Sequence, residues 1–171
     1  MSLFWKKEEP MAIEDAKRLA AEQALMENKK QSDSKTCYNH LEAQFLLGYH
    51  GVVLKVYLEN FKRMNELFGF EYCEELLDNI LDYLEQKTRC KVYRYVGVEF
   101  IIILRDRTMG EASRLAEQLI DRFEYSWTVE NTDCLCAIRL GLCAYPGYAT
   151  NAGEMLKCLD LAVSRAAEME G

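Results

Sequence analysis

The sequence predicts a fold of the α/β (α+β) class, in which a mixed central sheet is flanked by helices and preceded by an N-terminal helix. Short apolar segments rich in β-branched residues alternate along the chain with longer segments whose apolar residues recur every three or four positions, the spacing of one helix face. Two short segments, 91–95 and 100–104, flank a brief turn containing Gly97 and predict a β-hairpin. A hairpin within an otherwise alternating order favours a mixed sheet with helices on its faces.

The first expected element is a helix over residues 10–30. Acidic side chains gather at its start and Lys29 and Lys30 stand at its end, an arrangement that suits the helix dipole. Its apolar positions are spaced alternately by four and three residues, which fits either a short coiled-coil seam or a solvated helix that leans on the main domain. The seam positions are Ala12, Ala16, Leu19, Gln23 and Met26.

The polar stretch 31–35 interrupts this pattern and is the best candidate for a boundary. It divides the chain into a linker helix, residues 1–36, and a main domain, residues 37–171. In the main domain the β-branched segment 51–58 predicts a buried strand. Later elements are helices over 61–68 and 73–87, the hairpin, a helix from 108 opened by a Thr108–Glu111 capping box, a strand over 134–144 and a last helix capped by Asn151.

Composition limits the classes of function. Of the 171 residues, 50% are hydrophobic and 29% are charged, a balance typical of a globular chain with a real core. The net charge of −7 argues against nucleic acid as a partner, because binding to a phosphate backbone needs a positive surface. The longest apolar run, residues 100–104, is far shorter than the roughly 20 residues that span a bilayer, so no membrane segment is expected in this chain.

The seven cysteines form no C-x-x-C pair, and His40 and His50 are the only histidines. A zinc site is therefore disfavoured. Cysteines within apolar segments are expected to be reduced, small hydrophobic residues in the core of a cytoplasmic protein. They are Cys37, Cys73, Cys90, Cys134, Cys136, Cys143 and Cys158.

Several stretches of the main domain resemble the GGDEF diguanylate cyclase family. Residues 58–70 (LENFKRMNELFGF) resemble its D-x-D-x-F-K-x-x-N-D-x-x-G-H stretch. Residues 94–100 (RYVGVEF) resemble its R-x-G-G-D-E-F signature, with valine at two of the five signature letters. Residues 139–142 and 159–162 fall where the family has S-I-G-I and A-D-x-A. The resemblance implies a nucleotidyl-cyclase-like fold for the main domain and a signalling role for the helix before it.

The resemblance also implies an enzyme in which two GTP-loaded domains meet and form cyclic di-GMP. Attack on the α-phosphate requires that divalent metal, basic side chains and backbone N–H groups neutralise the triphosphate. The family supplies carboxylate ligands for Mg²⁺ from the first strand and from the third signature position. Tyr57 and Val98 stand at those positions here, and neither is a useful magnesium ligand at neutral pH.

Other parts of the family's site differ as well. The closing lysine that contacts phosphate corresponds to Ala167, and the product-inhibition R-x-x-D motif is replaced by residues 87–90 (KTRC). The first signature glycine is a valine, whose side chain fills space that the family leaves empty. The signature remnant consists of Val96, Gly97, Val98, Glu99 and Phe100.

Some family residues are retained. By resemblance, Lys62 faces phosphate, Asn65 contacts the guanine edge, and Glu74 replaces the aspartate that shares this contact. Glu59 lies two residues after Tyr57, so both face the same side of a strand. One interpretation is a rescue in which Glu59 and Glu99 hold one metal ion. The other is that Glu59 is a solvated acid at the end of the strand.

We therefore expect a degenerate GGDEF domain with no working catalytic residues, no metal or other cofactor, and weak or no GTP binding. It is expected to act as a regulatory, dimerisation or protein-interaction module of a bacterial cyclic di-GMP signalling protein, through the N-terminal helix or a face of the domain. One alternative is an atypical diguanylate cyclase that uses Glu59 and Glu99 with Mg²⁺. The other is a GTP-binding sensor without turnover that uses Lys62, Asn65 and Glu74.

Overall fold

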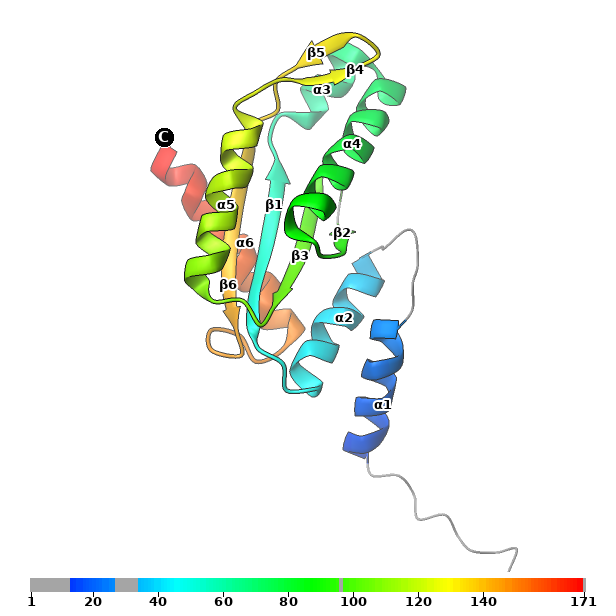
Figure 1. Ribbon diagram of the computed structural model, residues 1–171, viewed down its shortest axis with the longest axis vertical. Coiled ribbons are helices and arrows are strands. Elements are labelled where there is room, and N and C mark those ends of the chain that lie inside the picture. The colour runs from blue at the N-terminus through cyan, green and yellow to red at the C-terminus, as the bar shows by residue number, and fades with distance from the viewer. Residues whose placement is uncertain (1–12, 27–33, 96, 171) are drawn as a thin grey trace, which may run out of the picture.

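A four-stranded sheet lies at the centre of the computed structural model, which describes residues 13–26, 34–95 and 97–170 (Figure 1). The strand order is β2-β3-β1-β6. These strands are β1 (Gly51–Leu58), β2 (Val92–Arg94), β3 (Glu99–Arg105) and β6 (Ile138–Tyr145). The α+β class and a central sheet flanked by helices are confirmed.

The direction of the strands differs from the expected mixed sheet. Strand β1 lies between β3 and β6 and is antiparallel to both, and β2 is antiparallel to β3. The described sheet is therefore antiparallel. The chain leaves β1 through α3 (Phe61–Phe68) and α4 (Phe70–Thr88), enters the sheet at β2 and only then returns beside β1 as β3. The order of elements along the sequence does not reveal that β3, and not β2, lies beside β1.

Helices cover both faces of the sheet (Figure 1). Because successive side chains of a strand point to opposite faces, β1 supplies residues to two cores. Val52, Leu54, Val56 and Leu58 pack in one core with residues of α4 and of α5 (Met109–Phe123). Val53 packs in the other core with residues of α2 (Ser34–Leu46) and α6 (Ala152–Glu170). This double burial explains the nearly continuous apolar run of β1.

Local signals in the sequence agree closely with the helix ends. Helix α3 has the predicted bounds. At the start of α5 the Glu111 N–H donates to Thr108 Oγ1 over 3.1 Å, and the Thr108 N–H donates to Glu111 Oε1, which completes the capping box. At the start of α6 the Glu154 N–H donates to Asn151 Oδ1 over 2.9 Å. Short-range hydrogen bonding therefore sets these helix ends.

Three elements were not predicted: α2 and the hairpin of β4 (Trp127–Val129) and β5 (Thr132–Cys134). Helix α2 buries polar residues together with apolar ones, which obscures its apolar face, and His40 contacts the Tyr93 hydroxyl. The strand predicted over 134–144 is the end of β5 followed by β6, with residues 135–137 outside any strand. Glu130 and Asn131 adopt positive φ angles and form the tight turn between β4 and β5.

The N-terminal helix α1 (Ile13–Met26) packs on α2, where Ala21 joins Ala43 and Leu47 in a small buried cluster. Ile13 and Leu19 are exposed. Of the predicted seam, Ala12 lies outside the described residues, as do the side chains of Gln23 and Met26. The predicted boundary at residue 36 falls within α2, and the division into 1–36 and 37–171 stays a prediction. No helix in the described ranges is long and apolar enough to cross a membrane.

The expectation that every cysteine is reduced was wrong for one pair. Cys143 of β6 and Cys158 of α6 form a disulfide, because α6 crosses directly over β6. The other five cysteines are free. Burial raises the pKa of the Cys37 and Cys136 thiols to about 12, so both stay protonated at neutral pH.

Gly141 permits the close approach of α6 to β6. A Cβ atom at this position would lie 3.0 Å from the Leu159 carbonyl oxygen and 3.0 Å from Val163 Cγ2. Both contacts are tighter than ordinary van der Waals packing, so a side chain here would force the neighbouring atoms of α6 to shift. The helix and the residues that it carries toward the sheet therefore depend on this glycine.

We expect Gly141→Ala to lower the free energy of unfolding by about 1–3 kcal/mol, because the added methyl group overpacks the interface between α6 and β6. Urea denaturation followed by circular dichroism measures the change. Gly147→Ala is the matched control, since a Cβ atom there meets nothing within 4 Å. Equal stability of the two variants would contradict this account of Gly141.

Candidate functional site

The residues singled out from the sequence lie around the end of β1 and the hairpin formed by β2 and β3. Tyr57 is paired in register with Glu99 of β3 on one side and with Arg139 of β6 on the other. The three residues therefore stand side by side across the sheet. Glu59 follows β1 directly, and its N–H donates to the Ala137 carbonyl oxygen over 2.9 Å.

A buried lysine organises the charges on this face. Lys55, in the middle of β1, is only 4% exposed. Its ammonium group lies 3.1 Å from Glu99 Oε2 and also donates to the Asp160 carboxylate of α6. Burial lowers the pKa of Lys55, but the hydrogen bonds and negative charges of Asp160 and Glu99 outweigh this effect and raise the pKa overall. Lys55 is therefore charged at neutral pH.

A second ion pair lies beside the first. Arg139 Nε contacts Glu59 Oε1, and both side chains are largely buried. The two acids of the rescue interpretation, Glu59 and Glu99, are thus held by different cations, Arg139 and Lys55. Each carboxylate therefore already has a cation beside one of its oxygen atoms.

Glu74 is also engaged. Its two carboxylate oxygens each accept a hydrogen bond of 3.2 Å from the Arg94 guanidinium group, in a bidentate pair that joins α4 to β2. Arg94 Nε donates further to the Gly97 carbonyl oxygen over 3.3 Å. Arg94 therefore links the turn of the signature hairpin to α4. It also pairs with the Glu74 carboxylate, which the family resemblance assigns to a guanine contact.

The other two retained residues lie on α3. Lys62 is exposed at its first turn. Asn65 is half-buried, and its Oδ1 atom is buried without a hydrogen-bond partner among the described residues. Asn65 thus keeps an unused polar atom, whereas both carboxylate oxygens of Glu74 accept hydrogen bonds from Arg94.

The signature remnant is partly absorbed into the core. Val98 packs against the core on the α4 and α5 side, and its carbonyl oxygen accepts from the Leu58 N–H over 3.2 Å. Phe100 is fully buried, and Gly97 adopts a φ of +60° at the turn. Val96 and the side chain of Ala167 lie outside the described residues.

These residues do not fit a magnesium site. The positions that would supply carboxylates hold an aromatic ring at Tyr57 and an apolar side chain at Val98, and the ammonium group of Lys55 holds Glu99. In the described ranges, no group of three or more His, Cys, Asp or Glu side chains is arranged to bind a metal ion. An added divalent cation would also be repelled by the adjacent ammonium group.

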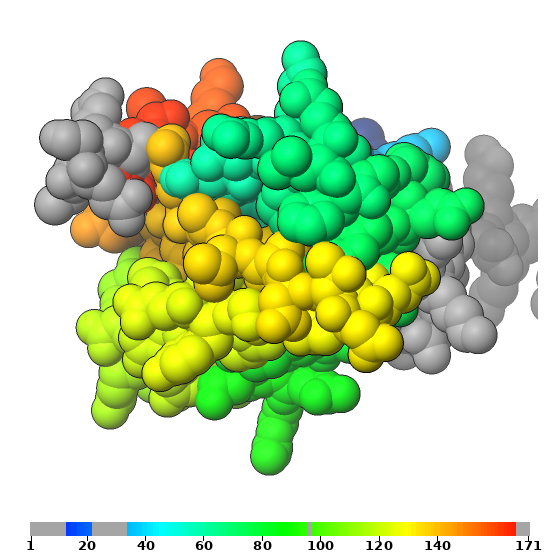
Figure 2. All heavy atoms as spheres, turned by 90° about the horizontal axis from the view of Figure 1, so that it is seen from above, coloured from blue at the N-terminus to red at the C-terminus, as the bar shows by residue number. Residues whose placement is uncertain are grey.

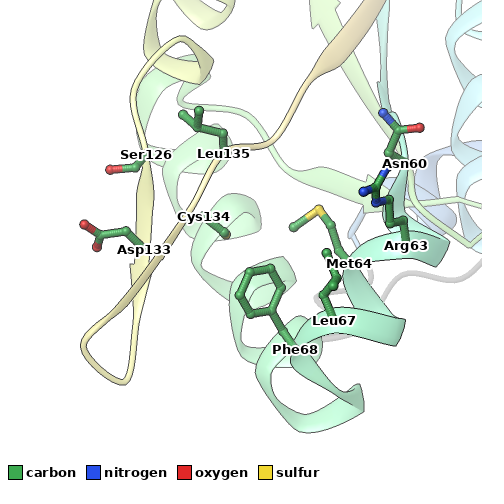
Figure 3. A pocket seen from close by; sticks show the side chains of 9 residues that line it. All are labelled: Asn60, Arg63, Met64, Leu67, Phe68, Ser126, Asp133, Cys134 and Leu135. Carbon is green, nitrogen blue, oxygen red and sulfur yellow. The ribbon is translucent and has the colours of Figure 1, made fainter.

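A pocket of about 530 Å³ lies at the end of the molecule shown in Figure 2, between α3 and the segment around β5. In Figure 3, Met64 and Phe68 project from α3 toward Cys134 across the pocket. The polar residues stand at its edges, Asn60 and Arg63 on one side and Ser126 and Asp133 on the other. Leu67 and Leu135 complete the lining and are 66% and 68% exposed. The pocket is therefore mainly apolar and open to solvent.

Four residues of this region escaped the sequence analysis as charge partners: Lys55, Arg94, Arg139 and Asp160. The lysine inside the apolar run GVVLKVYL could have indicated an ion pair, because a buried ammonium group needs a carboxylate partner. Its partners were not foreseeable, since Asp160 lies 105 residues away.

Comparisons with known proteins agree on one family. The family model "Diguanylate cyclase, GGDEF domain" matches residues 26–170. The signalling protein YkoW of Bacillus subtilis is 29% identical over 132 residues, which are 75% of this chain and 16% of YkoW. This chain spans about a sixth of the length of several curated relatives that it matches.

Solved structures show the same fold. The GGDEF domain of PA1120 from Pseudomonas aeruginosa has a TM-score of 0.74 and 19% identity, over 82% of this chain and 92% of that one. The diguanylate cyclase SiaD of Pseudomonas aeruginosa, solved in complex with its activator SiaC, has a TM-score of 0.73 and 17% identity, over 88% of this chain and 61% of that one.

The two carboxylates that pair with Lys55 differ in exposure, so we expect their removal to lower the stability of the protein by different amounts. The Glu99 side chain is 23% exposed and that of Asp160 is 65% exposed. Glu99→Gln should lower the free energy of unfolding by about 1–3 kcal/mol, because it removes the more buried charge partner of Lys55. Asp160→Asn should lower it by less than about 1 kcal/mol, because solvent screens that pair. Urea denaturation of both variants measures the difference, and a larger loss for Asp160→Asn would contradict the ranking.

Proposed function

From the premise that this chain belongs to the GGDEF diguanylate cyclase family, we propose that it is a catalytically silent member. It acts as a regulatory, protein-interaction module within a cyclic di-GMP signalling protein. One observation carries the proposal: Tyr57 and Val98 stand where carboxylates would hold metal. Phosphoryl transfer depends almost entirely on positioning and on neutralisation of charge, so the loss of both ligands removes its basis.

The atypical cyclase is disfavoured by the ion pairs around Tyr57. The alternative needs Glu59 and Glu99 to bind one metal ion. Arg139 engages the first and Lys55 the second. Freeing Glu59 would leave Arg139 without its carboxylate partner, and freeing Glu99 would leave the buried Lys55 with only the exposed Asp160, so both steps are unfavourable.

The GTP sensor is disfavoured by a similar argument. It needs Glu74 and Asn65 to read the guanine edge and Lys62 to face the phosphates. Glu74 is held by Arg94 through two hydrogen bonds. Asn65 keeps an unpaired buried oxygen atom, but an amide without its carboxylate partner makes fewer hydrogen bonds to the base. We propose that GTP binds weakly or not at all.

The apolar pocket supports the role in protein interaction. We propose that its occupant is a segment of a partner protein that inserts an apolar side chain between Met64 and Cys134 and places a carboxylate beside Arg63. Arg63 has no ion-pair partner within the described ranges, although the chain carries an excess of acids. Exposed leucines around an apolar hollow are typical of interaction surfaces. SiaD, whose fold this chain shares, is itself in complex with a protein activator.

We further propose that the module works in the cytoplasm. Five of its cysteines are free, which suits a reducing compartment, and the Cys143–Cys158 disulfide is the exception. Because this chain spans only a small share of its curated relatives, other parts of such proteins would supply the signal and the output.

The proposal predicts no formation of cyclic di-GMP when the protein is incubated with GTP and Mg²⁺ or Mn²⁺. Product separation by liquid chromatography measures turnover, and calorimetry with GTP and GDP measures binding. Asn65→Ala is the matched variant for calorimetry, since it removes the unpaired amide. Formation of cyclic di-GMP would overturn the silent role, and tight GTP binding that Asn65→Ala abolishes would favour the sensor instead.

The pocket should bind an anionic apolar dye such as anilinonaphthalene sulfonate, with its rings in the hollow and its sulfonate beside Arg63. Dye fluorescence on titration measures the affinity. Leu135→Asp and Arg63→Gln should each weaken binding about tenfold, which corresponds to 1.4 kcal/mol. Leu161→Asp is the control, because Leu161 is exposed on α6 and does not line the pocket. Equal affinities for all variants would exclude the pocket as the apolar binding surface.

A further inference from the structure

Lys55 carries an ammonium group in the interior of the domain. It stands in β1 between Ile101 of β3 and Gly141 of β6, the residues paired with it in register. Its neighbours along β1 are apolar, and its side chain is 5% exposed. A lysine this deeply buried is rare unless a counter-charge compensates the loss of hydration. The structure provides two counter-charges from two different elements.

The first counter-charge comes from the signature hairpin. Glu99 starts β3, two residues from the register partner of Lys55, and its Oε2 atom lies 3.1 Å from the ammonium nitrogen. The second comes from the C-terminal helix, where Asp160 reaches the same nitrogen. Asp160 is brought within reach because Gly141 lets α6 lie directly on the sheet beside Lys55. One cation therefore links three elements: β1, the hairpin and α6.

The Lys55 ammonium group joins two carboxylates from separate elements, as a bound metal ion would. A divalent ion in a protein joins carboxylates from separate elements and cancels their repulsion. Here the ammonium group donates to carboxylates of β3 and α6, and it rises from the strand whose end holds Tyr57 in place of a ligand. Arg139 neutralises Glu59 in the same way on the neighbouring side. Lys55 thus offsets one of the two negative charges of Glu99 and Asp160, and Arg139 offsets that of Glu59.

We propose that the Lys55 ammonium group is the resident cation of this site, that it replaces a divalent metal ion, and that it links the signature hairpin to α6. The inference deepens the proposed function, on which it rests, because a silent module must keep its fold without metal or nucleotide. Since the charge is covalently attached, the link is permanent. The hairpin and α6 then stay joined whatever the supply of metal ions or GTP.

Binding of Mn²⁺ tests the replacement directly, and electron paramagnetic resonance reports the bound fraction without any enzymatic turnover. The wild-type protein should take up no Mn²⁺ at Glu99. Lys55→Met leaves the two carboxylates without a cation and should bind Mn²⁺ there, with a rise in melting temperature on addition of Mn²⁺ that the wild type does not show. Lys55→Arg keeps the charge and is the control that should not gain this binding.

Each result bears on the inference. Uptake of Mn²⁺ by the wild type that Glu99→Gln abolishes would overturn it, as would a folded Lys55→Met variant that takes up no more Mn²⁺ than wild type. Loss of the gained binding in the Lys55→Met, Glu99→Gln double variant would support it. These readouts differ from cyclic di-GMP formation, so a failure of the replacement and a failure of the silent role are distinguishable.

A second measurement covers the case in which Lys55→Met does not fold. Asp160 is largely exposed, so Asp160→Asn is expected to fold and to weaken only the link through α6. Amide hydrogen exchange should then become several-fold faster at the Glu99 end of β3 as well as in α6. Asp82→Asn makes the same chemical change at an exposed residue of α4 and is the control. Unchanged exchange in β3 would overturn the proposed link.

Discussion

The charge of Lys55 in a strand buried on both faces is the constraint around which this domain is organised. A buried ammonium group is tolerated only when carboxylates replace its lost hydration. Glu99 supplies one from the hairpin, and Asp160 supplies the other from α6. The second contact requires α6 to lie close to the sheet, and Gly141 provides the room. These contacts join the hairpin, β1 and the last helix at one point.

The same contacts support the proposal that this member of the family is catalytically silent. A fold positions functional groups but does not determine which groups they are. In this chain the end of β1 holds Tyr57, the signature holds Val98 in contact with the core, and the remaining acids are paired with Lys55, Arg139 and Arg94. We therefore regard the site as a set of ion pairs that belong to the structure. Its ion pairs join neighbouring structural elements.

The open apolar surface lies elsewhere, at the end of the molecule formed by α3 and the β4–β5 hairpin (Figure 2). Exposed Leu67 and Leu135 flank a hollow of about 530 Å³ whose one unpaired cation is Arg63, within the described residues. Paired charges at one site and an open apolar pocket at another support the proposed contact with protein rather than nucleotide. The regulatory role that we propose rests on this difference between the ion-paired site and the apolar pocket.

The sequence by itself determined the α+β class, the family resemblance, the bounds of α3 and the capping of α5 and α6, because each depends on residues only a few positions apart. The tertiary structure alone decided the antiparallel strand order, the β4–β5 hairpin and the Cys143–Cys158 disulfide. It also decided the partners of the predicted site residues: Glu74 with Arg94, Glu59 with Arg139, and Glu99 with Lys55. These pairs join residues distant in sequence, and they form only when the sheet register and the crossing of α6 bring the charges within a few ångströms of one another.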